Sequence, residues 1–178
     1  GRLVGQKPSL ANTAGGPLQM EPILYACFSR FMRADRNQRD GIIQTVRILL
    51  SDSADSNAFF WHKSGNENWL QSALYAAAGI ANDLELLTLL LDAGAHVDKR
   101  DTEVLYHTIE FPDPACLRLL LERGNVPVEQ CSYCMARATD YEYPSHVRLL
   151  LDAGADPNYR FNWGGLRTQL HKAVYVCR

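Results

Sequence analysis

The sequence of 178 residues has neither a long basic run nor a long apolar run, and its formal net charge is only −2. A nucleic-acid-binding domain normally carries a basic stripe, so we expect no nucleic-acid partner. A membrane-spanning helix needs about 18 or more consecutive apolar residues, whereas the longest stretch of small apolar residues covers 73–81. We therefore expect no membrane partner, and a packed helix at 73–81.

Cysteine is scarce and unevenly spaced. Its five positions are Cys27, Cys116, Cys131, Cys134 and Cys177. An odd number without regular spacing does not favour a disulfide framework, so we expect reduced thiols in a hydrophobic core. Reduced thiols are typical of intracellular proteins, which predicts a cytoplasmic or nuclear location.

The motifs of common catalytic and metal sites are also missing. Cys131 and Cys134 form the one pair with metal or redox spacing, but a structural zinc site needs four ligands, usually from two such pairs. The five histidines show no zinc-binding spacing, and no phosphate-binding glycine loop is present. We expect no metal, no cofactor, no small-molecule substrate and no enzymatic activity.

One short pattern occurs four times along the chain. Each copy is a run of apolar residues that closes with Leu50, Leu91, Leu121 or Leu151, at spacings of 41, 30 and 30 residues. A regular period of this length predicts a stack of repeated supersecondary units. Chains of this kind usually bind other molecules and seldom catalyse reactions.

Each copy predicts an amphipathic helix with a marked end. Val147, Leu150 and Leu151 recur at i, i+3 and i+4, so we expect them to share one helix face. A glycine follows the later copies where a left-handed C-terminal cap is expected, at Gly94, Gly124 and Gly154.

A weaker pattern with small residues precedes each of these helices, beginning near residues 22, 72, 103, 132 and 169. It predicts a first helix that neighbouring helices can approach closely, so the unit is two helices, a cap and a polar loop. Tyr25, Tyr75 and Tyr106 recur at one position of this first helix. We expect them to form a stacked ladder inside the array.

Three segments carry a specific resemblance. Residues 168–173 read Thr-Gln-Leu-His-Lys-Ala, which matches the Thr-Pro-Leu-His-x-Ala signature of ankyrin repeats at all but the proline. Residues 152–158 resemble the end of the family's second helix and the start of its finger loop, and 92–95 resemble it nearly as well. The chain therefore resembles an ankyrin-repeat protein over about 17–178. It departs at His107, where the family has Ala, and at an insertion, Arg33–Gly41, between the first two helices.

The resemblance implies an all-α solenoid of about four and a half ankyrin-type helix-turn-helix repeats with finger loops. We expect a flexible N-terminal arm or linker at 1–16 and the repeat array at 17–178. The expected repeats cover 17–63, 64–98, 99–127, 128–161 and, in part, 162–178. Because the fifth repeat stops after its first helix and no Met begins the chain, we expect a fragment of a longer array. The alternative is a natural short C-terminal cap.

The loops between repeats differ in length, with 18, 8, 7 and 14 residues between the cap and the next helix. The two long loops are rich in aromatic residues, and Trp, Tyr and Arg often dominate interface energetics. The predicted partner-binding residues are Trp61, His62, Lys63, Lys99, Arg100, Tyr159, Arg160, Phe161 and Trp163. The alternative is that these aromatic residues, with Phe59 and Phe60, cover the helices, and that the turn 98–101 is merely solvated.

Together these features predict non-catalytic recognition of another protein. The resemblance implies that the finger loops and the concave helix face make the contacts, and a rigid frame loses little entropy on docking. The alternative is a regulatory or targeting segment of a larger enzyme or channel whose chemistry lies outside this chain.

Overall fold

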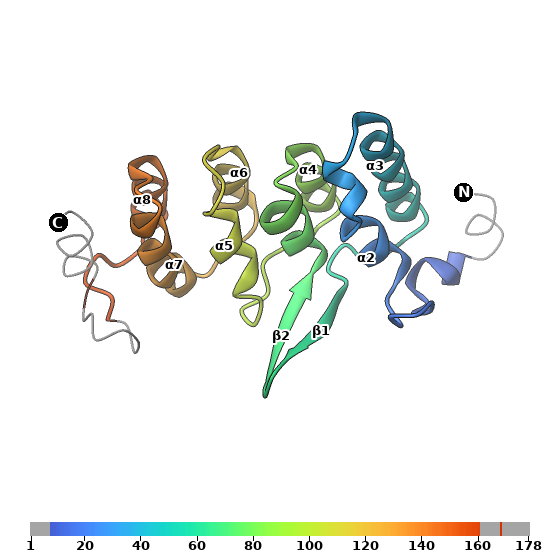
Figure 1. Ribbon diagram of the computed structural model, residues 1–178, viewed down its shortest axis with the longest axis horizontal. Coiled ribbons are helices and arrows are strands. Elements are labelled where there is room, and N and C mark those ends of the chain that lie inside the picture. Colours follow the sequence, from blue (N-terminus) through green and yellow to red (C-terminus); the bar gives the residue numbers. More distant parts are fainter. Residues whose placement is uncertain (1–7, 161–167, 169–178) are drawn as a thin grey trace.

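The structure is a computed structural model of the chain and describes residues 8–160 and Thr168. These residues form four consecutive helix pairs that stand side by side, with a two-stranded hairpin projecting from them (Figure 1). The first helices contact one another in the order α2, η3, α5, α7, and the second helices in the order α3, α4, α6, α8. The described chain is therefore two rows of helices with one hairpin at their edge.

The elements have the following bounds. The first row contains α2 (Pro22–Cys27), the π-helix η3 (Tyr75–Ala81), α5 (Glu103–Thr108) and α7 (Val128–Asp140). The second row contains α3 (Arg36–Ser51), α4 (Leu84–Asp92), α6 (Ala115–Arg123) and α8 (Pro144–Asp152). The hairpin joins β1 (Phe59–Ser64) to β2 (Glu67–Ser72), and two short 3-10 helices, η1 (Pro8–Asn12) and η2 (Arg30–Arg33), belong to the N-terminal part.

The core lies between the two rows and contains the leucines of the repeated pattern. Leu90, Leu120 and Leu150 are fully buried, and burial of such a side chain contributes about 1.5–3 kcal/mol. The predicted apolar face of α8 is wrong at one position, because Leu151 is 42% exposed. α8 is the last helix of the described array, so no described helix lies beyond it.

The glycine caps are confirmed at two of three positions. Gly94 and Gly154 have φ of 91° and 92°, which the absence of a Cβ permits. Gly124 instead has φ −82°, and the next residue, Asn125, takes the left-handed conformation at φ 54°. Asn tolerates this conformation because its short polar side chain can bond locally, so this reversal lies one residue later than predicted.

The predicted insertion at Arg33–Gly41 is not a separate loop. Helix α3 already begins at Arg36, and Asp35 caps it by accepting a hydrogen bond from the backbone N–H of Gln38 at 2.9 Å. The polar residues of this segment therefore extend the helix at its start. An apolar pattern could not reveal this turn, because its residues are mostly exposed.

The expectation of an all-α chain is wrong at the first long loop, which forms the antiparallel hairpin. Its strands pair from Phe59 with Ser72 to Ser64 with Glu67, so the connection contains only two residues. Gly65 supplies the positive φ, 60°, that such a tight connection requires. The aromatic residues on either side favour strand over helix, since they fit a pleated and half-exposed surface.

The ends of the array are less regular. Part of the expected arm packs on the rest of the chain, because Ala11 in η1 is fully buried. The amide of Asn12 joins it to the loop after α3, by donating to Ser53 O and accepting from Asp55 N, each at 2.7 Å. The partial fifth repeat at 162–178, including His171, lies outside the described residues apart from Thr168.

Helix η3 contacts α5 at a glycine. A Cβ on Gly79 would lie 2.7 Å from Cδ2 of Tyr75 and 3.1 Å from Cβ of His107. Glycine therefore allows the Tyr75 ring to lie between the two helices. The π-helix ends at Asn82, which takes a left-handed conformation at φ 48°.

Candidate protein-binding surface

The strand register sorts the hairpin side chains onto two faces, because successive residues of a strand point to opposite sides. The first face carries Phe59, Trp61 and Lys63 with their partners Ser72, Leu70 and Asn68. The second face carries Phe60, His62 and Ser64 with their partners Gln71, Trp69 and Glu67. The two faces have different surroundings.

The first face presents two large aromatic rings to solvent. Phe59 is 39% exposed and Trp61 is 52% exposed. Their ring centroids lie 6.1 Å apart in a T-shaped arrangement. Each ring therefore retains apolar surface that a partner could bury.

Arg100 reaches this face from the loop between α4 and α5. Its guanidinium carbon lies 5.3 Å from the ring centroid of Phe59 and 5.9 Å from that of Trp61, within the range of cation–π contacts. Asp98 fixes the arginine by accepting from its Nε and Nη2 at 3.0 and 2.6 Å. These bonds lower the pKa of Asp98 to about 2. Phe59, Trp61, Asp98 and Arg100 are called the aromatic–arginine cluster below.

A cavity of about 230 Å³ adjoins this cluster, since Phe59 and Asp98 line both. Buried Leu70 and Leu74 give it apolar walls, and nearby polar groups include the side chain of Asp55. Pockets for drug-sized ligands are usually about 300–1,000 Å³. The cavity therefore suits a single side chain better than a whole ligand of that size.

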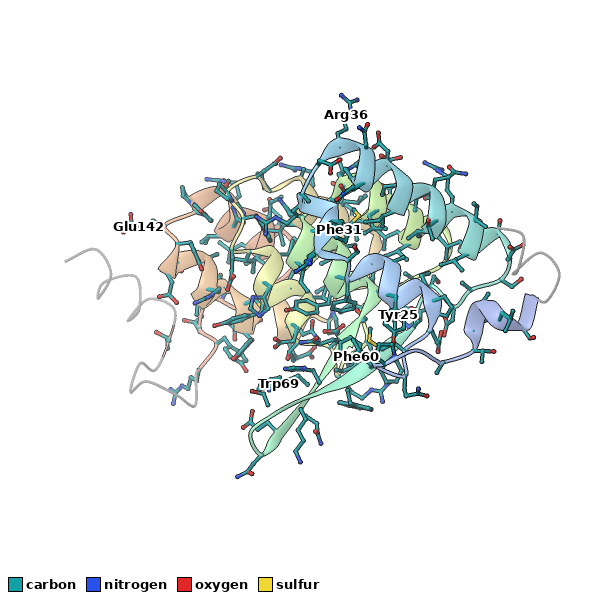
Figure 2. All side chains as sticks on the ribbon, turned by 45° about the vertical axis from the view of Figure 1, so that its right-hand side comes forward. Tyr25, Phe31, Arg36, Phe60, Trp69 and Glu142 are labelled. Carbon is teal, nitrogen blue, oxygen red and sulfur yellow. The ribbon has the colours of Figure 1, made fainter. Side chains whose placement is uncertain are left out.

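The second face attaches the hairpin to the first helix row. The Phe60 ring meets Phe28 edge-on at a centroid distance of 5.1 Å, and Phe28 meets Tyr75 at 6.1 Å. Figure 2 shows Phe60 where the hairpin meets the helices and Trp69 nearer the hairpin tip. Phe60 is thus a cover over the helices, whereas Trp69 is 37% exposed.

The base of β2 is fastened by a buried carboxylate. Asp101 is fully buried and accepts hydrogen bonds from the backbone N–H groups of Ser72 at 3.2 Å and Val104 at 3.3 Å. Burial raises its pKa to about 6, although these hydrogen bonds oppose the shift. Gln130 on α7 donates to the backbone oxygen of Asp101 at 3.3 Å. One residue therefore links the hairpin, α5 and α7.

A second polar and aromatic group lies on the first helix row. Arg137 is ion-paired with Glu110 and lies 4.8 Å from the ring centroid of Tyr106 and 5.0 Å from that of Tyr141. His107 contacts Glu103 and Glu110, each at 3.3 Å, and the hydrogen bond with Glu103 is the main cause of its raised pKa. These charges are satisfied within the chain, so the group fastens α5 to α7.

The expected tyrosine ladder is only partly correct. Tyr75 contacts His107 at 5.6 Å, His107 contacts Tyr106 at 5.3 Å, and Tyr106 contacts Tyr133 at 6.2 Å. Tyr25 bonds instead to the loop before α2, by donating to Gly15 O at 2.9 Å. The imidazole of His107 contacts the rings of both Tyr75 and Tyr106, and the alanine of the ankyrin pattern is too small to make these contacts.

The structure brings together some of the predicted binding residues. Trp61 and Arg100 belong to one cluster, with Lys99 next to Arg100 in the chain. His62 and Lys63 lie in the outer half of β1. The segment 153–160, which contains Tyr159 and Arg160, follows α8 and lies on the far side of α5–α8 from the hairpin (Figure 1). Phe161 and Trp163 lie outside the described residues.

Sequence reasoning missed the partners that orient the cluster. Asp98 precedes Arg100 by two residues, a spacing that also occurs in ordinary exposed turns. The sequence therefore did not indicate that Asp98 holds the Arg100 side chain in place. The sequence alone is consistent with Phe59 as a cover over the helices. Successive side chains of a strand point to opposite faces, so Phe59 and Phe60 are separated only once this segment is known to be a strand.

The described thiols are poorly suited to nucleophilic chemistry. Cys27, Cys116, Cys131 and Cys134 are buried and unbonded. Burial raises the pKa of Cys27 and Cys116 to about 12 and that of Cys131 to about 11, and a thiolate is the reactive form. Within residues 8–160 and at Thr168, no group of His, Cys, Asp and Glu is arranged to hold a metal ion. None of the helices in this part of the chain has the length and hydrophobicity needed to cross a bilayer.

Comparison with known families gives one match, and it covers part of this surface. Residues 69–102 match the ankyrin repeat. This ankyrin-repeat element includes most of β2, both helices of the second pair, and the loop with Asp98 and Arg100. Ankyrin repeats generally mediate protein–protein interaction. No curated protein matches the chain.

Proposed function

We propose that this chain is a non-catalytic recognition module that binds a partner protein through the hairpin and the neighbouring Asp98–Arg100 turn. The aromatic–arginine cluster carries the proposal. It combines exposed Phe59 and Trp61 with an arginine that Asp98 already holds in place. Aromatic and arginine side chains are the commonest anchors of protein interfaces.

The helix pairs on either side act as the frame in this proposal. We infer that the described pairs are ankyrin-type repeats, with repeats at about 17–63, 64–98, 99–127 and 128–161. Two observations support this: the match at 69–102, and the same packing order in every described pair. A frame whose helices are already stacked would order little on binding, which preserves affinity.

A protein partner fits the surface better than a small molecule does. The cavity beside Phe59 has about 230 Å³, enough for one anchoring side chain from a partner. The exposed ring of Trp61 adds contact area outside that cavity. An interface of this kind joins a central aromatic anchor to a polar rim, here supplied by Lys63 and Lys99.

The proposal is tested by affinity capture with quantitative mass spectrometry. The wild-type chain, Trp61→Ala and a control, Leu84→Ala, are immobilised in equal amounts. Leu84 is 46% exposed on α4, so its variant removes a similarly exposed apolar side chain from another surface. We expect a protein retained by the wild type and by Leu84→Ala, and reduced at least tenfold on Trp61→Ala.

Circular dichroism must show equal helix content for the three chains. If Trp61→Ala and Leu84→Ala capture the same proteins in the same amounts as the wild type, the cluster is not the binding surface. If Trp61→Ala loses helix content, the ring stabilises the fold, and the proposed role of Trp61 is wrong.

A further inference from the structure

Strand β1 has an unpaired edge, and the hairpin register shows which backbone groups lie on it. The backbone N–H of Ala73 donates to Ala58 O at 3.0 Å, so this opposed pair is a hydrogen-bonded one. Hydrogen-bonded and non-hydrogen-bonded pairs alternate along an antiparallel ladder. Phe59, Trp61 and Lys63 are therefore non-hydrogen-bonded residues, whose N–H and C=O groups point away from β2.

The opposite edge of the hairpin supports this assignment. Ser72 pairs with Phe59, so its N–H must also point outward, and it does donate to the carboxylate of Asp101. The outer edge of β2 is thus held at its base by a buried residue. Among the described residues, nothing occupies the corresponding outward groups of Phe59, Trp61 and Lys63.

An open edge of this kind is a template for another strand, and proteins usually protect it. Common protections are proline, bulges, inward-pointing charges and lysine. Strand β1 has no proline, and its six residues pair with β2 without a bulge. Lys63 is its single Lys, Arg, Asp or Glu residue and lies near the tip. Most of the edge is therefore open and bordered by aromatic rings.

We propose that β1 docks an extended segment of a partner protein, which adds to the hairpin as a third, antiparallel strand with an acidic residue opposite Lys63. Apolar residues of that segment lie opposite Phe59 and Trp61. Strand addition obtains affinity from main-chain hydrogen bonds and specificity from alternate side chains. This inference rests on the proposed function and specifies the shape and charge of the partner segment.

Charge favours an acidic segment. Strand β1 contains no acidic residue, and Lys63 makes no ion pair with any residue that the structure describes. Arg100 lies against Phe59 and Trp61 on the same face, but its charge is paired with Asp98, so the charge argument rests on Lys63. An acidic side chain opposite Lys63 forms the cross-strand pair of opposite charge that stabilises a sheet.

A second copy of this chain fits the same edge less well. The symmetric pairing of two β1 strands places Trp61 opposite Trp61 and Lys63 opposite Phe59. Each copy then brings Lys63 to a sheet whose two central strands have no acidic residue. This pairing adds a second Lys63 to the central strands and no acidic residue there to neutralise either one.

The test begins with random nine-residue peptides displayed on phage and selected on the immobilised full chain. We expect the selected peptides to alternate apolar with other residues and to carry an acidic residue toward one end. The strongest binder is then synthesised in two forms, with N-methyl groups on its odd or on its even residues. Strand pairing uses one edge of the peptide, so one form should bind at least tenfold more weakly while the other keeps its affinity.

Two variants at one position separate backbone pairing from side-chain contact. Lys63→Ala removes the charge and keeps the outward N–H, whereas Lys63→Pro also removes that N–H. Proline is tolerated on an edge strand when its missing N–H faces solvent. We expect a few-fold loss of peptide affinity for Lys63→Ala and at least tenfold for Lys63→Pro. Slow hydrogen exchange at the amide of His62 would show that the hairpin itself is intact.

The outcomes are distinct. Strand addition is overturned if the selected peptides do not alternate apolar with other residues. It is also overturned if the two N-methylated forms lose affinity to the same extent. If such peptides still bind the wild type more tightly than Trp61→Ala, the proposed binding surface survives while the strand-addition inference fails. If every such peptide binds Trp61→Ala as tightly as the wild type, the proposed binding surface and the strand-addition inference both fail. A dimer in sedimentation equilibrium that Lys63→Pro abolishes would make a second copy the occupant, which also overturns the inference.

Discussion

The carboxylate of Asp101 accepts the outward N–H of Ser72 at 3.2 Å and thereby closes one edge of the hairpin against the start of α5. The same carboxylate accepts from Val104 N at 3.3 Å, so the hairpin and the helix share one buried acceptor. Burial opposes the ionised form and raises the pKa of Asp101 to about 6. The stability of the folded chain is therefore linked to the protonation of Asp101.

This linkage predicts the pH dependence of stability. An unfolded Asp has a pKa of about 3.9, so the folded chain binds more protons than the unfolded chain between about pH 4 and pH 6. The free energy of unfolding must then fall as pH rises through this window, by about 2–3 kcal/mol from this group. We expect Asp101→Asn, which keeps an acceptor oxygen without the charge, to lack that component.

The measurement is urea unfolding of both chains from pH 4 to pH 7. The wild-type value minus the Asp101→Asn value should decrease across the window. A difference that stays constant would show that Asp101 has the same pKa in both states.

Two glycines give a matched pair of alanine substitutions. Gly79→Ala places a Cβ within 2.7 Å of the Tyr75 ring and 3.1 Å of His107, so the contact of η3 with α5 must shift. We expect a loss of about 1–3 kcal/mol in unfolding free energy. Gly41 lies inside α3, and a Cβ added there would have no other atom within 4 Å, so Gly41→Ala should gain about 0.5–1 kcal/mol.

Thermal and urea unfolding of both variants provide the comparison. Equal effects of the two substitutions would mean that the close approach at Gly79 does not constrain the packing.

The helix pairs could be predicted from the sequence because their apolar period repeats. The leucine that precedes the closing leucine is buried between the two helix rows in each of the three later copies, at Leu90, Leu120 and Leu150. The first turn of α3 could not be predicted in this way, because its residues Arg36 to Gly41 are mostly exposed. Polar residues at a helix start leave no periodic signal.

The proposed binding surface was predictable in composition and not in geometry. Clustered aromatic residues marked the first long loop, and a two-residue connection beginning at Gly65 would have indicated a hairpin. The contact of Arg100 with Trp61 joins two segments that are about 40 residues apart in the chain, and no local spacing encodes it. Tyr159, in the other aromatic loop, shows that similar composition can lie at a distant part of the array.

Helix α8 offers a test of the core assignment. Leu150 is fully buried, and Leu150→Ala should lower the free energy of unfolding by about 2–5 kcal/mol through lost packing and the cavity left behind. Leu151, its neighbour, is 42% exposed, and Leu151→Ala should change stability by about 0.5 kcal/mol or less. Urea unfolding at one pH measures both. Reversed magnitudes would show that α8 has a different rotation about its axis.

The aromatic–arginine cluster gives the last prediction, which concerns orientation. Asp98→Asn keeps one acceptor oxygen but removes the charge that holds Arg100, so the guanidinium should spend less time over Phe59 and Trp61. We expect the Nε–H resonance of Arg100 in a ¹⁵N-edited NMR spectrum to broaden or move toward its position in an unfolded chain. Because the pKa of Asp98 is about 2, the wild-type resonance should not titrate between pH 4 and pH 7.

A control, Asp92→Asn, alters the acidic residue that pairs with Arg123 on the second helix row at 2.6 Å, and should leave the Arg100 resonance unchanged. An Arg100 resonance that is the same in Asp98→Asn and the wild type would show that the aromatic rings alone hold this arginine.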